Sequence, residues 1–369
     1  MKIISVVSAR PNFVKLAALH HALRSGAGQA LEHVIVHTGQ HYDPLFSDIF
    51  FEQLEIPKPS YNLGIHADER EITITSTEEA LFSLLSQLKP DCVLVYGDVN
   101  GSLGGARAAK RAGVQLAHVE AGLRSFDQSM PEELNRIAVD QVADFLFCTE
   151  ESAIENLKRE KVDGSAHLVG NTMIDTLVRM MPFIEEQKLS HLLPNRFGVV
   201  TLHRPSNVDE PTILKRNIDF LVEVAPRCQL LLPCHHRLRS SLERFGLARF
   251  DDAGNCMNFL NKGLHICAPF GYVQFLHLIK KSAFIITDSG GIQEEAVFLQ
   301  KRCFTLRKNT ERPITIESGS NVLIDIADPE DRKEVLAFAS ESQTPAIEIP
   351  RLWDGRAGER ILETLQDTL

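Results

Sequence analysis

The sequence lacks the features of a nucleic-acid-binding or membrane protein. Its formal net charge is −10, which disfavours nonspecific binding to nucleic acid or to an anionic membrane surface. No apolar run approaches the roughly 18 residues that a membrane-spanning helix requires. The N-terminal run MKIISVV is too short for a signal peptide and reads as a first strand. We therefore expect a cytoplasmic protein that binds neither nucleic acid nor membrane.

The cysteine and glycine patterns exclude several kinds of site. There are seven cysteines, an odd number, and no two are spaced as CxxC. Cys92, Cys148 and Cys267 lie in apolar strand-like runs, as expected for core residues in a reducing compartment. No GxGxxG follows the first strand and no Walker lysine motif is present, so a dinucleotide cofactor or an ATPase P-loop is disfavoured. We expect no metal and no cofactor.

Apolar strand-like runs alternate with helical stretches along all 369 residues. This alternation predicts parallel sheets covered by helices on both faces. The length exceeds what one hydrophobic core usually holds, so two domains are expected. The first six runs are KIISVV, HVIVH, CVLVYG, VQLAHVE, FLFCT and HLVG, and the second six are FGVVTLH, QLLLP, LHICA, FIITD, CFTL and NVLI. The predicted fold is α/β, with two doubly wound Rossmann-like domains facing a cleft.

The two groups of strands are separated by a helical segment and a breaker. TMIDTLVRMMPFIEEQ is followed by LLPN, so we expect an N-terminal domain over 1–170 and an interdomain helix and linker over 171–196. The C-terminal domain is then expected over 197–354, with a terminal helix over 355–369.

Polar side chains gather where the predicted strands end. In doubly wound folds the carboxyl ends of the strands form the ligand-binding edge. The residues that follow strands in this way are Arg10, Gln40, His41, Asp98, Glu120, His203, Arg204, His235 and Asp288. Their placement at strand ends favours a functional site over polar residues that are distributed at random on the surface.

Carboxylates come from three of these strand-end segments, YGDV, HVEAGLRS and PEELNR. Asp98, Glu120 and Glu132 are the candidates, and crowded carboxylates suit proton abstraction and delivery. The alternative is structural: Asp98 caps a helix and Glu132 stabilises the first turn of another.

Basic and imidazole groups suggest an anion site. In SARPNFVK, Arg10 and Lys15 lie at the start of a predicted helix and can hold a diphosphate. His203 and His235 stand at two strand ends, with Arg204 and Arg237 following within two residues, although a lone histidine is more often structural. Arg312, in LRKNTERP, follows a later strand. A solvated surface role remains the alternative for all of them.

The stretch FIITDSGGIQEEA, residues 284–296, reads as a strand, a tight turn and a helix. Asp288 and Ser289 are cap-type residues, and Gly290 and Gly291 let the backbone approach a ligand. The free N–H groups at the helix start suit a phosphate. An ordinary capped helix is the alternative.

These motifs together resemble the UDP-N-acetylglucosamine 2-epimerase family. RPNFVK, YGDV, HVEAGLRS, PEELNR, TLHRPSN, DSGGIQEEA and NTERP occur in the family's order and spacing. The resemblance implies the GT-B fold, a homodimer, and a C-terminal helix that packs back on the first domain. It implies reversible epimerisation at C2 of a UDP-N-acetylhexosamine: UDP is eliminated to give 2-acetamidoglucal and then added back.

The resemblance also implies roles for individual residues. Asp98, Glu120, Glu132 and His203 match the family's catalytic residues. The residues implied to bind the substrate or its UDP are Arg10, Lys15, His235, Phe275, Ser289, Gly290, Gly291, Glu295 and Arg312. Gln40 and His41 match part of a site through which substrate activates some bacterial members.

The sequence departs from the family pattern at two places and leaves three functions open. Asn12 stands where the family often has a glutamate. The loop that begins at His235 reads HHR, where many members have proline or another residue after the first histidine. Both departures bear on the activating site. A hydrolysing epimerase would release N-acetylmannosamine and UDP, and related enzymes act on a modified UDP-sugar. The third alternative is a nucleotide-sugar-binding protein without turnover.

Overall fold

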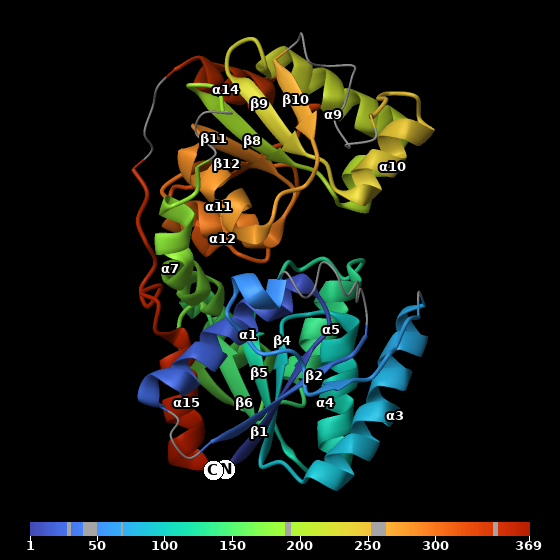
Figure 1. Ribbon diagram of the computed structural model, residues 1–369, viewed down its shortest axis with the longest axis vertical. Coiled ribbons are helices and arrows are strands. Elements are labelled where there is room, and N and C mark those ends of the chain that lie inside the picture. Colours follow the sequence, from blue (N-terminus) through green and yellow to red (C-terminus); the bar gives the residue numbers. More distant parts are fainter. Residues whose placement is uncertain (28–30, 40–49, 68, 189–192, 252–262, 342–345) are drawn as a thin grey trace. The chain divides into compact units, whose positions relative to one another are not determined.

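The computed structural model describes residues 1–27, 31–39, 50–67, 69–188, 193–251, 263–341 and 346–369. The chain forms two compact units (Figure 1). Unit 1 contains Met1–Met180 and Pro350–Leu369, and unit 2 contains Met181–Ile349. The division falls inside the helix that the sequence analysis assigned to an interdomain linker.

Unit 1 is built on a seven-stranded parallel sheet with the strand order β3-β2-β1-β4-β5-β6-β7. Its inner strands are mostly apolar, as expected for a sheet covered on both faces, whereas the two edge strands are not. The strands are β1 (Lys2–Val7), β2 (Glu32–His37), β3 (Tyr61–Asn62), β4 (Cys92–Tyr96), β5 (Gln115–Ala121), β6 (Phe145–Cys148) and β7 (Ser165–Leu168).

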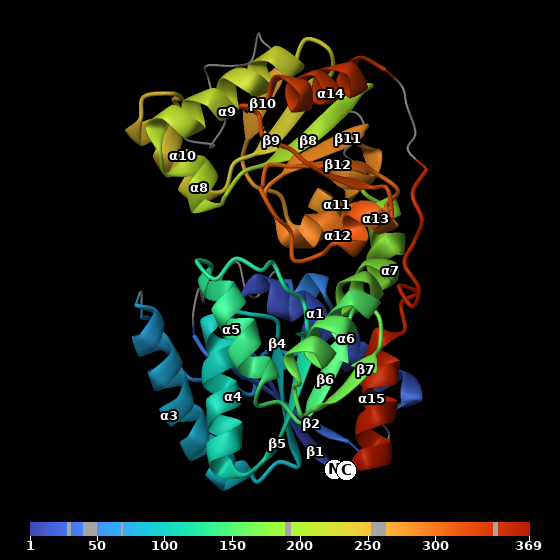
Figure 2. The same cartoon turned by 180° about the vertical axis from the view of Figure 1, so that it is seen from behind.

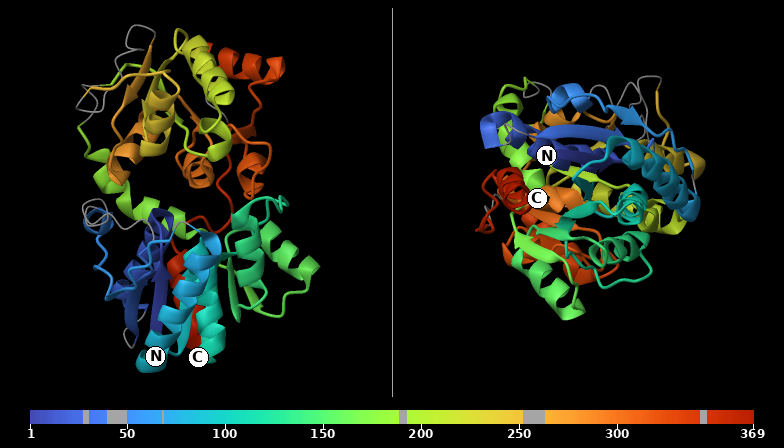
Figure 3. Two further views of the ribbon diagram at one scale, coloured as in Figure 1. Left: turned by 90° about the vertical axis from the view of Figure 1, so that its right-hand side faces the viewer. Right: turned by 90° about the horizontal axis from the view of Figure 1, so that it is seen from below.

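The helices of unit 1 fall into two groups. The crossover from β1 to β2 runs in the opposite direction to those from β4 to β5 and β6, so right-handed connections put their helices on opposite faces. α1 packs on α15, whereas α3 and α5 pack on α4. Both chain termini lie together in this unit (Figures 1 and 3). The helices are α1 (Arg10–Ala22), η1 (Leu23–Ala27), α3 (Arg70–Leu88), α4 (Asn100–Ala112), α5 (Pro131–Asp140), α6 (Glu151–Glu160), α7 (Thr172–Glu185) and α15 (Ala357–Thr368).

Unit 2 repeats the same principle with six parallel strands in the order β10-β9-β8-β11-β12-β13. Its strands are β8 (Phe197–Thr201), β9 (Gln229–Pro233), β10 (Leu264–Cys267), β11 (Phe284–Thr287), β12 (Arg302–Thr305) and β13 (Asn321–Leu323). Its helices, seen from behind in Figure 2, are α8 (Pro205–Val208), α9 (Pro211–Val224), α10 (His236–Arg244), α11 (Tyr272–Lys281), α12 (Gly290–Phe298), α13 (Ile314–Glu317) and α14 (Pro329–Ser340).

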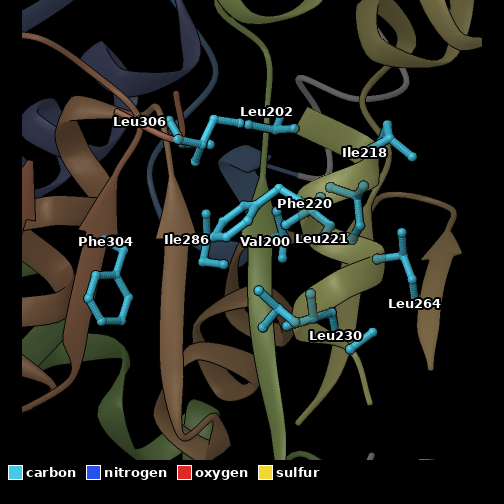
Figure 4. Packing of buried hydrophobic residues seen from close by; sticks show 14 of the residues in the cluster. Val200, Leu202, Ile218, Phe220, Leu221, Leu230, Leu264, Ile286, Phe304 and Leu306 are labelled. Atoms are coloured by element: carbon cyan, nitrogen blue, oxygen red, sulfur yellow. The ribbon is translucent and has the colours of Figure 1, made fainter. Parts of the chain in front are cut away.

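The core of unit 2 lies between this sheet and one layer of helices. Val200 of β8 and Ile286 of β11 pack with Leu221 of α9, and all three are fully buried (Figure 4). Burying one such aliphatic side chain contributes about 1.5–3 kcal/mol. This packing fixes the strands, and the strand ends therefore present their polar residues from a rigid support.

Each sheet has one place where the direction of winding reverses. In unit 1 this switch point lies between β1 and β4, and in unit 2 it lies between β8 and β11. Open α/β sheets bind their ligands outside the carboxyl ends of the strands at such a point. The switch points therefore define where a site is expected in each unit.

The predicted fold class is confirmed, and so are all twelve predicted strands. The two-residue β3 was missed because Tyr61 and Asn62 are both exposed and carry no apolar pattern. Among the described residues, no helix is long and apolar enough to span a bilayer.

Candidate functional site

Glu120 occupies a strained position at the end of β5. The register between β5 and β6 slips between Val119 and Ala121, so Glu120 is the extra residue of a bulge. Its φ is +73°, a left-handed conformation that costs a non-glycine residue about 1–3 kcal/mol. Bulges and strain of this kind are concentrated at functional sites, where they aim one side chain.

Lys15 of α1 holds the Glu120 carboxylate. Its Nζ lies 2.6 Å from Glu120 Oε2, and both side chains are about 5% exposed. The sequence analysis assigned Lys15 to a diphosphate, but in the structure its ammonium faces this carboxylate. Gly97, at φ +60°, leaves room for the pair because a Cβ there would lie 2.8 Å from Lys15 Nζ.

Asp98 is the second carboxylate at this switch point, and it is anchored by Arg136 of α5. One guanidinium nitrogen contacts Asp98 Oδ2 and another contacts Glu133 Oε2. Asn135 adds a 2.9 Å hydrogen bond to the Asp98 carbonyl. Asp98 keeps about a quarter of its side chain exposed, whereas Glu133 is buried. Asp98 is therefore held in place but remains accessible.

A fully buried charged cluster lies beneath these two carboxylates. His118 Nδ1 is 2.6 Å from Asp140 Oδ1, and its Nε2 is 2.9 Å from the Gly97 carbonyl. Asp140 also accepts hydrogen bonds from Gly122 N and from Arg124. The cluster thus fixes the backbone next to Asp98 and, through Gly122, next to Glu120.

The remaining unit 1 candidates differ in exposure. Arg10 and Glu132 are exposed at the starts of α1 and α5. Asn12 is buried: its Oδ1 accepts from Ser8 N at 3.0 Å, and its Nδ2 donates to the Tyr96 carbonyl at 2.9 Å. A glutamate carboxylate could not donate that second bond, so Asn12 joins the ends of β1 and β4 in a way the more usual residue cannot.

In unit 2, Asp288 is the centre of the switch point. Its fully buried carboxylate accepts from His203 N at 3.0 Å, Arg204 N at 2.9 Å and Asn207 Nδ2 at 3.2 Å. His203 Nδ1 lies 2.8 Å from Asp288 Oδ1. Burial alone would raise the pKa of Asp288, but the hydrogen bonds from His203 and Arg204 hold this pKa below its ordinary value. The sequence analysis placed Asp288 at a strand end and described it as a cap-type residue, without assigning it a contact with His203.

The turn after Asp288 leads directly into α12. Ser289 is the N-cap, and its side chain makes no capping bond. A Cβ on Gly290 would lie 2.6 Å from an Arg312 guanidinium nitrogen and 2.8 Å from Glu311 Oε1. Glycine at this position therefore lets the loop of residues 310–313, TERP, pack against the start of α12. Gly291 is half-buried.

Arg312 belongs to a buried ion cluster with two glutamates. Its Nε lies 3.0 Å from Glu294 Oε2, another guanidinium nitrogen contacts Glu311, and Arg307 pairs with Glu311 at 2.7 Å. The cluster pairs two arginines with two glutamates, so its formal charges sum to zero.

The Glu295 carboxyl has an unusually high pKa. Burial, together with the neighbouring charge of Glu294, raises its pKa to about 8. Tyr272 donates a 3.4 Å hydrogen bond to it, and burial raises the pKa of that phenol well above its ordinary value. Phe275, one turn along α11, is half-buried. A carboxyl, a phenol and an aromatic ring on these two helices can contact sugar hydroxyls and a base.

The candidates for substrate activation are only partly described. His235 is the exposed N-cap of α10, and its ring lies 4.1 Å from that of His236. Gln40 and His41 lie outside the described residues. In the part of the chain that is described, no group of three or more histidine, cysteine or acidic side chains could hold a metal ion.

Asp140, His118 and Arg136 are supporting residues that the sequence reasoning did not assign to the site. Their hydrogen bonds to one another, to Arg124 and to Asp98 span 16 to 38 residues of sequence, so no local pattern predicts these contacts. The one available signal was polarity inside the apolar run VQLAHVE, where His118 occupies a buried strand position.

Comparison with known proteins places these motifs in a family. The family model described as UDP-N-acetylglucosamine 2-epimerase matches residues 24–366. A UDP-2,3-diacetamido-2,3-dideoxy-D-glucuronate 2-epimerase of Pseudomonas aeruginosa is 38% identical over 375 residues, covering 99% of both chains. A UDP-N-acetylglucosamine 2-epimerase of Methanocaldococcus jannaschii is 36% identical over 383 residues, also covering 99% of both.

Solved structures show the same likeness. The crystal structure of Methanocaldococcus jannaschii UDP-GlcNAc 2-epimerase in complex with UDP-GlcNAc and UDP superposes with a TM-score of 0.86 at 34% identity, covering 100% of both chains. The two-domain α/β architecture of the GT-B type expected from the sequence is thereby confirmed.

Proposed function

The chain belongs to the UDP-N-acetylglucosamine 2-epimerase family, and from that premise we propose that it reversibly epimerises UDP-N-acetylglucosamine at C2 to UDP-N-acetylmannosamine. The observation that carries the proposal is the chemistry of the two switch points. One contains Asp98, a carboxylate that remains accessible, and Glu120, a buried carboxylate on a strained bulge. The other presents a histidine and an uncapped helix start.

The proposed reaction is an elimination followed by re-addition. The C2 proton has no adjacent ring carbonyl, so direct removal to a carbanion would be very costly. Breaking the C1–O bond at the same time avoids this cost: the C2–H electron pair forms a C1=C2 double bond, and the C1–O pair leaves with UDP. Protonation of 2-acetamidoglucal on its other face, with return of UDP to C1, gives the epimer.

Inversion at C2 needs acid–base groups on both faces of the sugar. We assign these roles to the carboxylates Asp98, Glu120 and Glu132, with His203 as the fourth catalytic residue. Lys15 supports this assignment because its ammonium, 2.6 Å from Glu120 Oε2, fixes the direction of that carboxylate. The strain at Glu120 is also easier to explain if that side chain must reach a reacting atom.

UDP binding is assigned mainly to unit 2. The N–H groups at the start of α12 suit the diphosphate, with Ser289, Gly290 and Gly291 around it. Glu295 suits the ribose hydroxyls and Phe275 the uracil. Arg10, His235 and Arg312 complete the proposed binding set, as the family resemblance implies.

The fate of the glycal after elimination distinguishes a non-hydrolysing epimerase from a hydrolysing one. We propose the non-hydrolysing outcome, in which UDP is retained and returned, rather than release of free N-acetylmannosamine. A cytoplasmic homodimer, and supply of the product sugar to surface polysaccharide synthesis, are part of the same expectation. Identification of the product checks the non-hydrolysing outcome, and a size measurement in solution checks the homodimer.

A modified substrate is the second candidate. It is favoured by the 38% identity to an enzyme named for UDP-2,3-diacetamido-2,3-dideoxy-D-glucuronate. The loop NTERP lacks a tryptophan, and by the family resemblance this favours plain N-acetylglucosamine. Parallel incubation with both UDP-sugars decides between them.

The experiment is proton NMR of UDP-N-acetylglucosamine incubated with the protein in D2O. UDP-N-acetylmannosamine carrying deuterium at C2, with little free UDP, is the expected result. Free N-acetylmannosamine with stoichiometric UDP would move the protein to the hydrolysing class. An unchanged spectrum with both UDP-sugars would overturn the proposal.

Arg10→Ala tests the binding assignment. Losing a guanidinium that contacts the diphosphate should weaken UDP binding by at least about tenfold, or roughly 1.4 kcal/mol. Isothermal titration with UDP measures this directly, and an unchanged affinity would remove Arg10 from the binding set.

A further inference from the structure

The Asp288 carboxylate has more partners than a cap or a loop anchor needs. Three of them are backbone or amide N–H groups of His203, Arg204 and Asn207. The fourth is the ring of His203 through Nδ1. Asp288 therefore fixes both the loop after β8 and the orientation of one side chain in that loop.

The opposite edge of the His203 ring faces outward. The side chain is 46% exposed although its Nδ1 edge is bonded to a fully buried carboxylate. Among the described residues, Nε2 has no hydrogen-bond partner. An ionised carboxylate can only accept, so Nδ1 is the ring nitrogen that donates to Asp288, and Nε2 is the nitrogen left for a ligand.

The same aspartate immediately precedes the helix start proposed for the diphosphate. Ser289, the next residue, is the N-cap of α12, and Arg204 Nε donates to the Asp288 carbonyl at 2.9 Å. His203 is thus tied to the residue that begins the phosphate-binding turn, and both belong to unit 2.

We propose that Asp288 is a positioning residue that holds His203 with Nε2 directed at the departing diphosphate, so that the ring becomes a charged donor when UDP is bound. The inference rests on the proposed function and adds a division of roles to it. Asp288 itself contacts no reacting atom. It acts through the His203 ring, as the buried aspartate of a catalytic triad acts through its histidine.

The step balances without a further reactant. As the C1–O bond breaks, its electron pair moves to the β-phosphate oxygen, and the C2 proton passes to a carboxylate of unit 1. His203 takes up a proton from water at Nε2 when the nucleotide binds, keeps it through the step, and donates a hydrogen bond from Nε2 to that oxygen. The charge developing on the diphosphate is then stabilised by an imidazolium, which the Asp288 carboxylate stabilises in turn.

The first test reads the protonation of His203 directly. In protein with 15N-labelled histidine, the resonances missing from His203→Asn identify this ring. We expect Nδ1 protonated and Nε2 unprotonated in free protein, and protonation of Nε2 when UDP is added. Protonation of Nε2 in the free protein with Nδ1 bare would overturn the orientation by Asp288.

The second test is a double-mutant cycle. Asp288→Asn should lower kcat by about 10²-fold or more, in the manner of a histidine held in the wrong tautomer, with UDP affinity changed by less than tenfold. In a His203→Asn background the same change should cost no more than about threefold, because its effect passes through the ring.

The controls separate positioning from folding and from failure of the proposed function. Asp209→Asn removes another unit 2 carboxylate that pairs with an arginine, Arg237, and should change neither the His203 resonances nor kcat by more than threefold. If Asp288→Asn keeps its full cost without His203, Asp288 is structural and the inference is wrong. If the wild-type protein neither turns over UDP-sugars nor binds UDP, the proposed function fails, whereas the resonances of the free protein still report on Asp288.

Discussion

The two switch points use opposite means to present their side chains. In unit 1, Glu120 is aimed by a strained bulge and by a buried cation, Lys15. In unit 2, Asp288 has a strand-end position without strain and is surrounded by N–H donors. The carboxylate is the presented group in the first unit and the hidden support in the second.

Under the proposed function, this difference separates a unit that moves a proton from a unit that holds an anion. A carboxylate that is fixed at a rigid strand end suits proton transfer at a carbon atom. A carboxylate buried beneath a histidine fixes that ring next to the residue that begins α12, whose first N–H groups suit a diphosphate. The same doubly wound frame therefore supports two chemistries, and the strand-end residues decide between them.

Removing the presented carboxylate of unit 1 should give the largest effect. Glu120→Gln cannot accept the C2 proton, so we expect kcat to fall by at least about 10³-fold, or roughly 4 kcal/mol of transition-state stabilisation. UDP affinity, measured by calorimetry, should stay within tenfold. Glu79→Gln, on the exposed side of α3, is the matched control and should keep full activity. Loss of UDP binding together with turnover would make Glu120 structural.

The stability of unit 2 should decline as the pH rises, because of Glu295. Its pKa of about 8 lies above the ordinary 4.5, so the unfolded chain releases this proton first. Between pH 5 and pH 7 the free energy of unfolding of unit 2 should fall by about 2–3 kcal/mol. Glu295→Gln should abolish that decline. The measurement is urea-dependent labelling of the buried Cys228 and Cys303, followed by mass spectrometry; an equal slope in the variant would contradict the assignment.

The stability of unit 1 should change in the opposite direction, because of His37. Burial, and the nearby charge of His66, lower its pKa from 6.5 to about 4. The unfolded chain therefore binds a proton first as the pH falls below 6.5. Between pH 7 and pH 5 unit 1 should lose about 2 kcal/mol from this residue. Labelling of Cys92 and Cys148, both buried, reports on unit 1 in the same samples.

His37→Asn sharpens this comparison. The Asn carboxamide can still accept the hydrogen bond that Gly39 N gives to His37 Nδ1. We expect a shallower acid slope in unit 1 and an unchanged slope in unit 2. His20 and His33, whose pKa values burial also lowers, to about 4 and about 3, should maintain part of the slope. A slope identical to that of the wild type would show that His37 does not contribute.

The smallest effect is expected at the helix start of unit 2. In Gly290→Ala the new Cβ displaces the guanidinium of Arg312 and the carboxylate of Glu311. UDP affinity should fall by about tenfold, or 1.4 kcal/mol, while kcat at saturating substrate changes by less than threefold. A fall in kcat with unchanged UDP affinity would reverse the roles proposed for the two units.

The strands and the strand-end residues could be predicted from the sequence because their signals are local. A buried parallel strand is a continuous apolar run, and the residue that follows it can be read directly, as at Asp98 and His203. The support beneath them could not be predicted. Asp288 contacts the loop after β8 across 81 to 85 residues of sequence, and the bulge at Glu120 exists only in register with β6.

The boundary between the units shows the same limit. Residues 172–185 form one continuous helix, which the sequence shows, but the packing that assigns its first part to unit 1 depends on distant segments. Asp175 of that helix accepts a 2.7 Å hydrogen bond from Gly358 N at the start of α15. No local pattern relates two residues that lie 183 positions apart.

The most direct test of the proposed division is hydrogen–deuterium exchange of the full chain with and without UDP. The account predicts that UDP slows exchange most strongly in peptides covering 284–298 and 201–208 of unit 2. Peptides covering 115–124, around Glu120, should change much less because they face the sugar and not the nucleotide. Protection confined to unit 1, with no change over 284–298, would contradict the assignment of the diphosphate to the switch point of unit 2.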